Sequence, residues 1–515
     1  MSKTTHPQNA FFELAHFIVD PRTVRLLSEQ YCRQNYVALL LRRDKSQGVP
    51  IVLGMLEPKN AGDMLAIVSQ RVGQQVEAVQ LNAYEITKAI DIGYAVARVE
   101  KRSELKLRLR PIMKKSFDPD SSPDQMVTEM LGHAISQGAS DVHIEAYEDD
   151  VDVRYRIDGV LHQRITPLDI DRLPSVISRL KILSDLDIAE RRSAQEGRIY
   201  ANYSHDGGER SVDVRISILP GIFGEDAVLR ILDSEKPLVG LERLGFIPEV
   251  LQSFRELCQN PEGLVIVTGP TGSGKTTTLY SALNEIRSES RKVLSVEDPI
   301  ETFLPKTNQK QVSSHMGFAD YLRAFLRQDP DVMMVGEIRD QDTAETSIRA
   351  AQTGHLVLST LHANHSVGVI ERLRMLNVSE KTIADSIVGS LAQRLVRRVC
   401  KHCKAEAEPT AFAQEVFQRV GGEFQLYHGV GCDACHGTGY LRRIGLYELF
   451  VNRPEISDSI ANGEPNYKIR QRARSLGMRT LFEDGLIKAK AGVTTLDEIK
   501  RVVGYRLIRE TLDPA

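Results

Sequence analysis

Beyond residue 241 the chain alternates short apolar runs with longer segments of helical periodicity. The apolar runs lie at 264–267, 292–296, 331–335 and 355–359, and each has the length of a buried strand. Strands that alternate with helices in this rhythm form a parallel sheet with helices on both faces. We therefore expect an α/β domain at 241–515, with its functional residues at the carboxyl ends of the strands.

The preceding segment, 124–236, has a different pattern. It opens with a helical run, and polar and apolar residues then alternate at 151–157 and again at 212–217, as they do in half-buried strands. Residues 174–189 between them are helical in pattern, and Pro174 suits the first turn of that helix. The segment is predicted to be an α+β domain.

The first 105 residues contain no catalytic constellation. A short apolar stretch at 36–41 lies among polar helical segments, which predicts a small α/β accessory domain at 1–105. Basic residues at 101–111 and helix breakers at 116–123 predict a linker at 106–123. Because its charges are not sorted onto one helical face, a solvated linker is favoured over a lipid-contacting segment.

The first apolar run of the C-terminal domain leads directly into the pattern G-x-x-x-x-G-K-S/T. Its residues are Gly269, Pro270, Thr271, Gly272, Ser273, Gly274, Lys275 and Thr276, followed by Thr277. Glycines let such a loop wrap its N–H groups around phosphates, and the N-terminus of the next helix adds positive potential. Lys275 is predicted to contact the β- and γ-phosphates and Thr276 to ligate Mg²⁺. A purely structural turn is the alternative, and the strand–loop–helix order disfavours it.

Polar residues also follow the other three apolar runs. Glu297, Asp298 and Glu301 follow the second run, where carboxylates can hold the waters of Mg²⁺ or polarise an attacking water. Glu337 follows the third run, as an acidic residue does after a Walker B strand, and His362 follows the fourth, where it can sense or stabilise a γ-phosphate. Acidic clusters are common on solvated loops. Their joint placement after successive strands favours a catalytic edge.

Four of the six cysteines form two C-x-x-C pairs. The pairs are separated by 28 residues, and their members are Cys400, Cys403, Cys432 and Cys435. This spacing exceeds the usual ~15–20 residues of such zinc sites, but an insertion between the pairs is sterically harmless. We predict a structural Zn²⁺ with four thiolate ligands, and a redox dithiol is the alternative. Cys32 and Cys258 are expected to be core thiols.

Charge and hydropathy limit the classes of partner. The 515 residues include 66 Lys and Arg against 69 Asp and Glu, for a net charge of −3, so no nucleic-acid partner is expected. No stretch approaches the ~20 apolar residues of a membrane span, and the start of the sequence lacks a signal-peptide core. We expect a cytoplasmic protein that associates with membranes only through partners.

Five sequence blocks together resemble the secretion ATPase superfamily, in the branch that powers type II secretion and type IV pilus assembly. They lie at 269–280, 296–301, 327–331, 336–340 and 353–364. The resemblance extends over roughly 139–448. It implies a RecA-like P-loop domain, preceded by an α+β domain of PAS-like type, and a four-cysteine zinc element at 400–435.

The resemblance also implies roles for the acidic residues and the histidine. Glu301 would orient or deprotonate the attacking water, with Glu297 and Asp298 as alternates. Glu337 would act near Mg²⁺, and His362 would monitor the γ-phosphate.

Arginines outside the phosphate loop are further candidates. The resemblance implies that Arg215 and Arg230 of the α+β domain reach the bound phosphates. Arg323 and Arg327 are spaced to share one face of a predicted helix, which makes them candidates for nucleotide binding, although a solvated stripe is an equal alternative.

By the same resemblance the chain would be an ATP- and Mg²⁺-dependent motor that drives assembly of a type IV pilus or a type II secretion pseudopilus. It would form a homo-hexameric ring docked on an inner-membrane platform protein, with residues 1–105 binding other cytosolic or membrane-associated components. A related ring ATPase that moves DNA and a non-enzymatic nucleotide-dependent adaptor are the alternatives. The presence of Lys275, Glu301 and Glu337 together argues against the adaptor.

Overall fold

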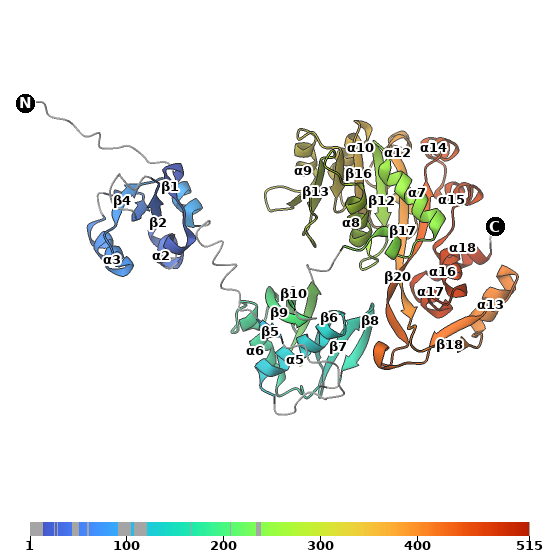
Figure 1. The fold of residues 1–515 in the computed structure, drawn as a ribbon, viewed down its shortest axis with the longest axis horizontal. Coiled ribbons are helices and arrows are strands. Elements are labelled where there is room, and N and C mark those ends of the chain that lie inside the picture. Colours follow the sequence, from blue (N-terminus) through green and yellow to red (C-terminus); the bar gives the residue numbers. More distant parts are fainter. Residues whose placement is uncertain are drawn as a thin grey trace, which may run out of the picture. The chain divides into compact units, whose positions relative to one another are not determined.

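The computed structural model divides the chain into two compact units, residues 1–105 and 106–515, and each is described by itself (Figure 1). The described residues are 14–24, 26–27, 29–43, 51–58, 61–90, 105–107, 121–164, 166–205, 208–232 and 238–513. Most of the predicted linker at 106–123, and the predicted end of the second domain at 233–236, lie outside them.

The N-terminal unit is a small α/β fold, as predicted. Its four strands pair in the order β1 (Phe17–Ile18), β2 (Val37–Arg42), β3 (Ile51–Met55) and β4 (Glu77–Gln80). Its helices include α1 (Pro21–Val24), α2 (Glu29–Asn35) and α3 (Gly62–Val72). Strands β2 and β3 are apolar except for Arg42 at the end of β2, and they supply much of the buried core, into which Cys32 also packs.

The second unit begins with an α+β fold. Its seven-stranded sheet has the order β5 (Leu105–Leu107), β9 (Gln195–His205), β10 (Gly208–Pro220), β11 (Glu225–Leu232), β6 (Ala139–Ala146), β7 (Val151–Ile157) and β8 (Val160–Arg164). Helices α5 (Pro123–Ser136) and α6 (Leu173–Leu183) pack together, and the buried Tyr155 of β7 donates to the Met130 carbonyl of α5. Val153 is also buried, so Arg154 and Arg156 lie on the face away from the helices. The PAS-like character of this fold stays a prediction.

The helix predicted at 174–189 is shorter than the pattern indicated. Helix α6 ends at Leu183, because Ser184 bonds back to the Leu180 carbonyl and Asp185 adopts a left-handed φ of 55°. Aspartate tolerates this conformation better than most residues and often ends a helix.

The rest of the unit is a seven-stranded sheet that is parallel except at one edge. Its order is β14 (Thr307–Gln311), β13 (Val293–Glu297), β15 (Val332–Val335), β16 (Leu356–Leu361), β12 (Gly263–Thr268), β17 (Ile387–Val399) and β20 (Tyr440–Val451), with β20 antiparallel to β17. The four predicted strands are β12, β13, β15 and β16. Strand β14 was missed because its residues are polar and it lies at an edge, and β17 and β20 were not predicted.

Helices cover both faces of this sheet, as predicted (Figure 1). Leu264 and Ile266 of β12 face one core, and Val265 and Val267 face the other. The helices before the β17 strand are α7 (Pro248–Gln259), α8 (Lys275–Ile286), α9 (Phe318–Phe325), α10 (Gln341–Gln352), α11 (Gly368–Met375) and α12 (Glu380–Ser386). Those after β20 are α14 (Pro454–Ala461), α15 (Asn466–Ser475), α16 (Leu481–Lys490), α17 (Leu496–Val502) and α18 (Tyr505–Leu512).

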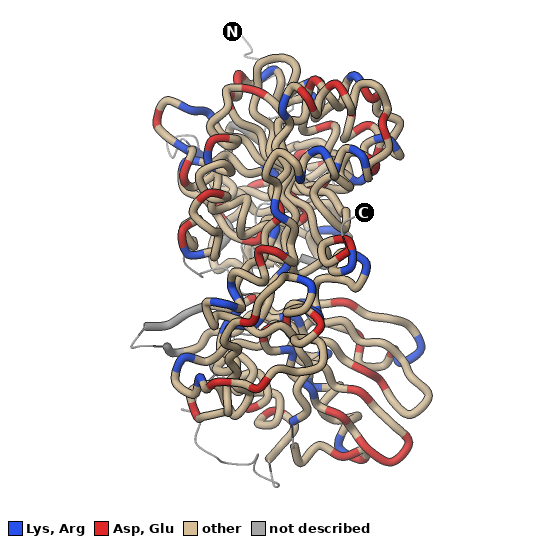
Figure 2. The backbone as a smooth tube through the Cα atoms, turned by 90° about the vertical axis from the view of Figure 1, so that its right-hand side faces the viewer, with Lys and Arg blue, Asp and Glu red and all other residues tan. Residues whose placement is uncertain are grey.

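The charged residues are mixed in sign along the backbone (Figure 2). This agrees with the net charge of −3. Within the described ranges, no helix is both long enough and apolar enough to cross a membrane.

Candidate nucleotide site and candidate metal site

The loop between β12 and α8 has the backbone that a phosphate loop needs. Gly274 precedes α8 with a φ of 87°, a left-handed conformation that side chains rarely allow. A Cβ on Gly269 would lie 2.5 Å from the Gln393 carbonyl oxygen, so only glycine fits there. Because α8 begins at Lys275, its free N–H groups adjoin the loop.

Two side chains of this loop fit phosphate binding. Lys275 Nζ donates to the Gly269 carbonyl at 3.0 Å and to the Pro270 carbonyl at 3.2 Å, which folds its ammonium group back over the loop. Ser273 Oγ is buried and has no hydrogen-bond partner among the described residues. A buried hydroxyl without a partner costs about 1–3 kcal/mol, and a phosphate oxygen would remove that cost. The pKa of Lys275 lies below its ordinary value, chiefly because the side chain is buried. The nearby charge of Arg394 lowers this pKa further, whereas the charges of Glu337 and Glu301 oppose the shift.

Glu297 is held inside the protein rather than presented to a ligand. Its side chain is only 3% exposed. One carboxylate oxygen accepts from Ser295 Oγ at 2.7 Å and from Gln309 Nε2 at 3.0 Å, and the other accepts from Tyr280. With both oxygens engaged, Glu297 is a poor candidate for activating water.

Glu301 is better placed for that role. The residue reaches solvent, and its backbone N–H donates to the Tyr280 hydroxyl at 3.3 Å. Burial by surrounding atoms raises the pKa of the Glu301 carboxyl and so does Glu297, while Arg215 and Lys275 oppose the rise. A carboxylate with a raised pKa is a stronger base. The geometry therefore favours Glu301 over Glu297.

Glu337 and His362 come together from neighbouring strands. Glu337 follows β15, His362 follows β16, and His362 Nε2 lies 3.1 Å from Glu337 Oε1. Arg339 Nε donates to the other Glu337 oxygen at 2.8 Å and Arg339 also lies 3.5 Å from Asp298. Acid and histidine thus meet at the carboxyl edge of the sheet, and the charge of Glu337 also acts on Lys275. Their catalytic roles stay predictions.

Gln393 of β17 is a residue of this site that sequence analysis missed. Its carbonyl backs Gly269, and its side-chain Oε1 accepts from Thr278 Oγ1 of α8 at 2.8 Å. Gln393 therefore connects β17 to the phosphate loop and to helix α8, which follows the loop. The run 387–399 mixes polar and apolar residues, so nothing in its pattern marked Gln393.

Three arginines lie in a row across the sheet of the α+β fold. Arg215 of β10 is directly opposite Arg230 of β11 on one side and Arg198 of β9 on the other. Arg230 pairs with Asp141 at 3.0 Å, and Arg198 lies 3.9 Å from Asp213. The buried Nε of Arg215 has no hydrogen-bond partner among the described residues. Like charges directly opposite each other repel, and an anion such as phosphate would relieve this. Arg198 was missed because strand register is not visible in the sequence.

The prediction that Arg323 and Arg327 share one helical face is wrong. Helix α9 ends at Phe325, so Arg327 lies on the turn that follows it. Arg323 is exposed and pairs with Asp320 at 2.8 Å. This arrangement favours the solvated alternative.

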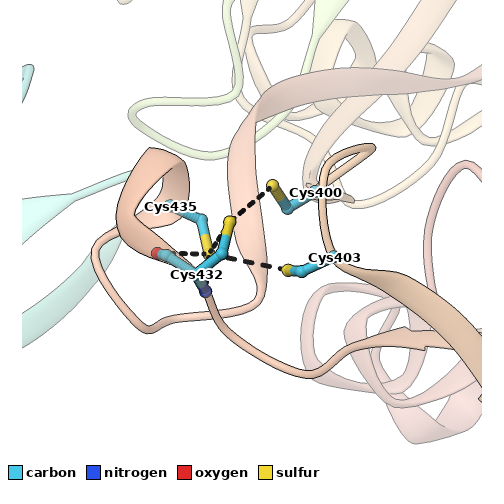
Figure 3. Close-up of side chains that lie close together, drawn as sticks. All are labelled: Cys400, Cys403, Cys432 and Cys435. Atoms are coloured by element: carbon cyan, nitrogen blue, oxygen red, sulfur yellow. Dashed lines mark hydrogen bonds between the residues drawn. The ribbon is translucent and has the colours of Figure 1, made fainter.

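The four paired cysteines converge on one point (Figure 3). The Sγ atoms of Cys400 and Cys432 are 3.8 Å apart, as are those of Cys403 and Cys435, and all four lie within 4.8 Å of one another. A tetrahedral Zn²⁺ with Zn–S bonds of about 2.3 Å requires sulfurs about 3.8 Å apart. The Cys432 and Gly439 N–H groups also point at Cys435 Sγ, at 3.2 and 3.3 Å. The residues therefore fit a closed thiolate site.

The long spacing between the cysteine pairs is filled by a small folded insertion. It consists of β18 (Lys404–Ala407), α13 (Ala411–Val420) and β19 (Leu426–Gly429), and the two strands pair antiparallel. The hairpin returns the chain to the second pair beside the 3₁₀ turn η4 (Asp433–Cys435). Cys258 is buried in α7, as expected for a core thiol.

Comparison with known proteins identifies relatives over most of the chain. Residues 118–501 match the family described as "Type II/IV secretion system protein". The chain is 41% identical over 495 residues to the type IV pilus assembly ATPase PilB of Thermus thermophilus, covering 93% of this chain but about half (54%) of that relative. It is 42% identical over 391 residues to the type II secretion system ATPase E of Vibrio cholerae, covering 75% of this chain and 76% of the relative.

A solved structure is similar in fold. The ATPase DotB of Legionella pneumophila matches with a TM-score of 0.54 and 22% identity, over 77% of this chain and 98% of DotB. At this identity the likeness supports the fold alone.

Proposed function

This chain belongs to the type II/IV secretion system protein family and is an ATPase, and from that premise we propose that it works as a hexameric ring. The ring drives assembly of a type IV pilus or a type II secretion pseudopilus through an inner-membrane platform protein. The observation that carries the proposal is the convergence of Lys275, Glu301, Glu337 and His362 at one edge of a parallel sheet.

The phosphate loop holds the triphosphate. Backbone N–H groups at the start of α8 and the Ser273 hydroxyl donate to phosphate oxygens, and Lys275 leaves its two carbonyl partners to contact the β- and γ-phosphates. Thr276 would ligate Mg²⁺, which when bound neutralises phosphate charge.

The residues after β13, β15 and β16 act on the attacking water and the γ-phosphate. Glu301 accepts the proton of the water, because its raised pKa makes it a stronger base than an ordinary glutamate carboxylate. Glu337 would act beside the Mg²⁺ ion. His362, which contacts Glu337, would detect whether the γ-phosphate is present. Glu297 holds Tyr280, whose hydroxyl accepts the Glu301 N–H, and so it positions the base.

The arginine row supplies positive charge to the phosphates during turnover. Arg215→Ala is expected to lower kcat about tenfold to hundredfold, less than the loss of a complete arginine finger, because Arg198 and Arg230 remain. Nucleotide affinity should change far less. Steady-state kinetics and equilibrium nucleotide binding measure both quantities. Arg179→Ala is the matched control, because Arg179 lies on α6, on the other side of the sheet. If kcat is the same in the two variants, Arg215 is not part of the site.

A ring in which neighbouring subunits complete each site must lose specific activity on dilution. Turnover of Mg²⁺-ATP per chain is expected to rise with protein concentration and then level off, in step with hexamer formation measured by analytical ultracentrifugation. Lys275→Ala should be inactive at every concentration. Constant, Lys275-dependent turnover in a protein that stays monomeric contradicts the ring. Stimulation by DNA that falls steeply with salt would point to the DNA-moving alternative.

A further inference from the structure

The segment 361–367 begins at the last residue of β16 and carries His362. Its start is held by β12, the strand that leads into the phosphate loop. Thr268, the last residue of β12, donates its hydroxyl to the Leu361 carbonyl at 2.6 Å. The Thr268 hydroxyl oxygen in turn accepts a hydrogen bond from the Ala363 N–H at 2.8 Å. This end of the segment is therefore tied to the strand that leads into the phosphate loop.

The other end is held by a buried ion pair on a different part of the domain. The N–H and the hydroxyl of Ser366 both donate to one carboxylate oxygen of Glu448, at 2.9 and 2.7 Å. Glu448 lies on β20 and is fully buried. The guanidinium group of Arg470, on α15, donates to both Glu448 carboxylate oxygens, at 2.7 and 2.8 Å. The segment that carries His362 is thus joined through Ser366 and Glu448 to Arg470 of the C-terminal helices.

Packing alone does not hold this segment. A cavity of about 1390 Å³ lies beside it, and its lining includes Asn364, His365 and Arg470. Leu361 and Val367 at its two ends are buried in the apolar core. The middle of the segment, at Asn364 and His365, faces this open space, so the position of the middle depends largely on polar contacts. These are the contacts of Thr268 and Ser366, with Arg394 donating to the Asn364 carbonyl at 2.9 Å.

The buried pair is charged. Burial raises the pKa of Glu448, but the Arg470 charge and the hydrogen bonds from Arg470 and Ser366 outweigh it, so the pKa lies below its ordinary value. A buried ion pair is often no more stabilising than apolar residues of the same size. Stabilisation of the fold therefore does not by itself explain why Glu448 and Arg470 are paired here. Orientation of the segment 361–367 explains the pair better, because the bidentate contact fixes the Glu448 carboxylate that Ser366 binds.

We propose that Glu448 and Arg470 are positioning residues for ATP hydrolysis, which act by fixing the segment 361–367 so that His362 meets Glu337. Neither residue touches the nucleotide. The proposal rests on the role of His362 in the proposed function.

Two variants test the contact without altering His362. Ser366→Ala removes one hydrogen bond to Glu448 and leaves the ion pair intact, and Glu448→Gln removes the charge while keeping the side-chain shape. Both are expected to lower kcat roughly tenfold or more, since small misplacements of catalytic groups have such effects, with the KM for ATP within about threefold. If Glu448→Gln fails to fold, Ser366→Ala decides alone.

Glu498→Gln is the matched control. Glu498 is also buried and paired with arginines, Arg397 at 2.6 Å and Arg501 at 2.8 Å. These partners join β17 to α17 and lie outside the segment 361–367. It is expected to lose thermal stability and keep kcat. If kcat in Ser366→Ala or Glu448→Gln is within twofold of Glu498→Gln, the positioning role is overturned.

A double variant separates positioning from a general structural effect. Residues that act through one another are not additive, so adding Ser366→Ala to His362→Ala should lower kcat no further. A full additional loss overturns the proposal and leaves the proposed function intact. Normal turnover in His362→Ala itself contradicts the role of His362 in the proposed function and removes the positioning role with it.

Discussion

Replacement of Glu301 by glutamine is expected to slow ATP turnover roughly 10²- to 10⁴-fold while nucleotide affinity stays within about threefold. Glutamine has the shape of glutamate but cannot accept the proton of the attacking water. The phosphate loop, which binds the nucleotide, is unchanged. Single-turnover hydrolysis and equilibrium binding of a nucleotide analogue measure the two effects separately.

The pH dependence of the same variant gives a second readout. Burial and Glu297 raise the pKa of Glu301 above its ordinary 4.5, and only the deprotonated carboxylate accepts a proton. In the unaltered protein kcat should therefore fall as pH drops through a value above 4.5. Glu301→Gln should lack this acid limb.

Glu297→Gln is the control for this assignment. Because Glu297 is buried and hydrogen-bonded to Tyr280, Ser295 and Gln309, its loss should lower thermal stability and disturb kcat less than Glu301→Gln does. A larger fall in kcat for Glu297→Gln, with the acid limb lost from that variant instead, would assign the base to Glu297.

Removal of one zinc ligand is expected to release the metal and unfold the insertion between the cysteine pairs. Purified protein should contain about one zinc per chain, and Cys403→Ser should contain close to none. Structural zinc sites contribute on the order of 10 kcal/mol to the folding of small elements, because the bound state exists only when folded. Elemental analysis measures the metal, and limited proteolysis should cut the variant between residues 404 and 431.

Cys258→Ala controls for the loss of a thiol, because Cys258 is buried in α7 away from the cluster. It should retain about one zinc per chain. Zinc well below one per chain in unaltered protein purified without chelator, together with reversible disulfide formation between the pairs, would favour the redox alternative. Since four thiolates leave no open position, a catalytic role for the zinc is not expected.

The elements that sequence analysis predicted share a strong local signal. The apolar runs that became β12, β13, β15 and β16 are fully buried, and the order of strand, loop and helix around Lys275 is a local pattern. Strand β14 has no such signal, because its polar residues pair only through backbone groups at an edge. Helix α6 stops early for a local reason, the left-handed Asp185, that composition alone does not reveal.

The site divides in the same way. Lys275, Glu337 and His362 could be named because each follows a recognisable strand. The resemblance assigned the base to Glu301 and left Glu297 and Asp298 as alternates, since all three lie at or just after the end of β13. Burial and hydrogen bonding separate Glu297 from Glu301. Arg198 and Gln393 could not be named, because each is defined by a strand partner distant in the sequence.

The sequence by itself determined the α/β class, the phosphate loop, the acidic strand ends and the cysteine pairs, since these depend on residue type and short spacing. Tertiary structure decided which carboxylates are buried, which arginines align across strands, and how Ser366, Glu448 and Arg470 meet. Those contacts join residues as far as 82 positions apart. They arise only when the strands have paired and the helices have packed, because register and burial belong to the folded chain as a whole.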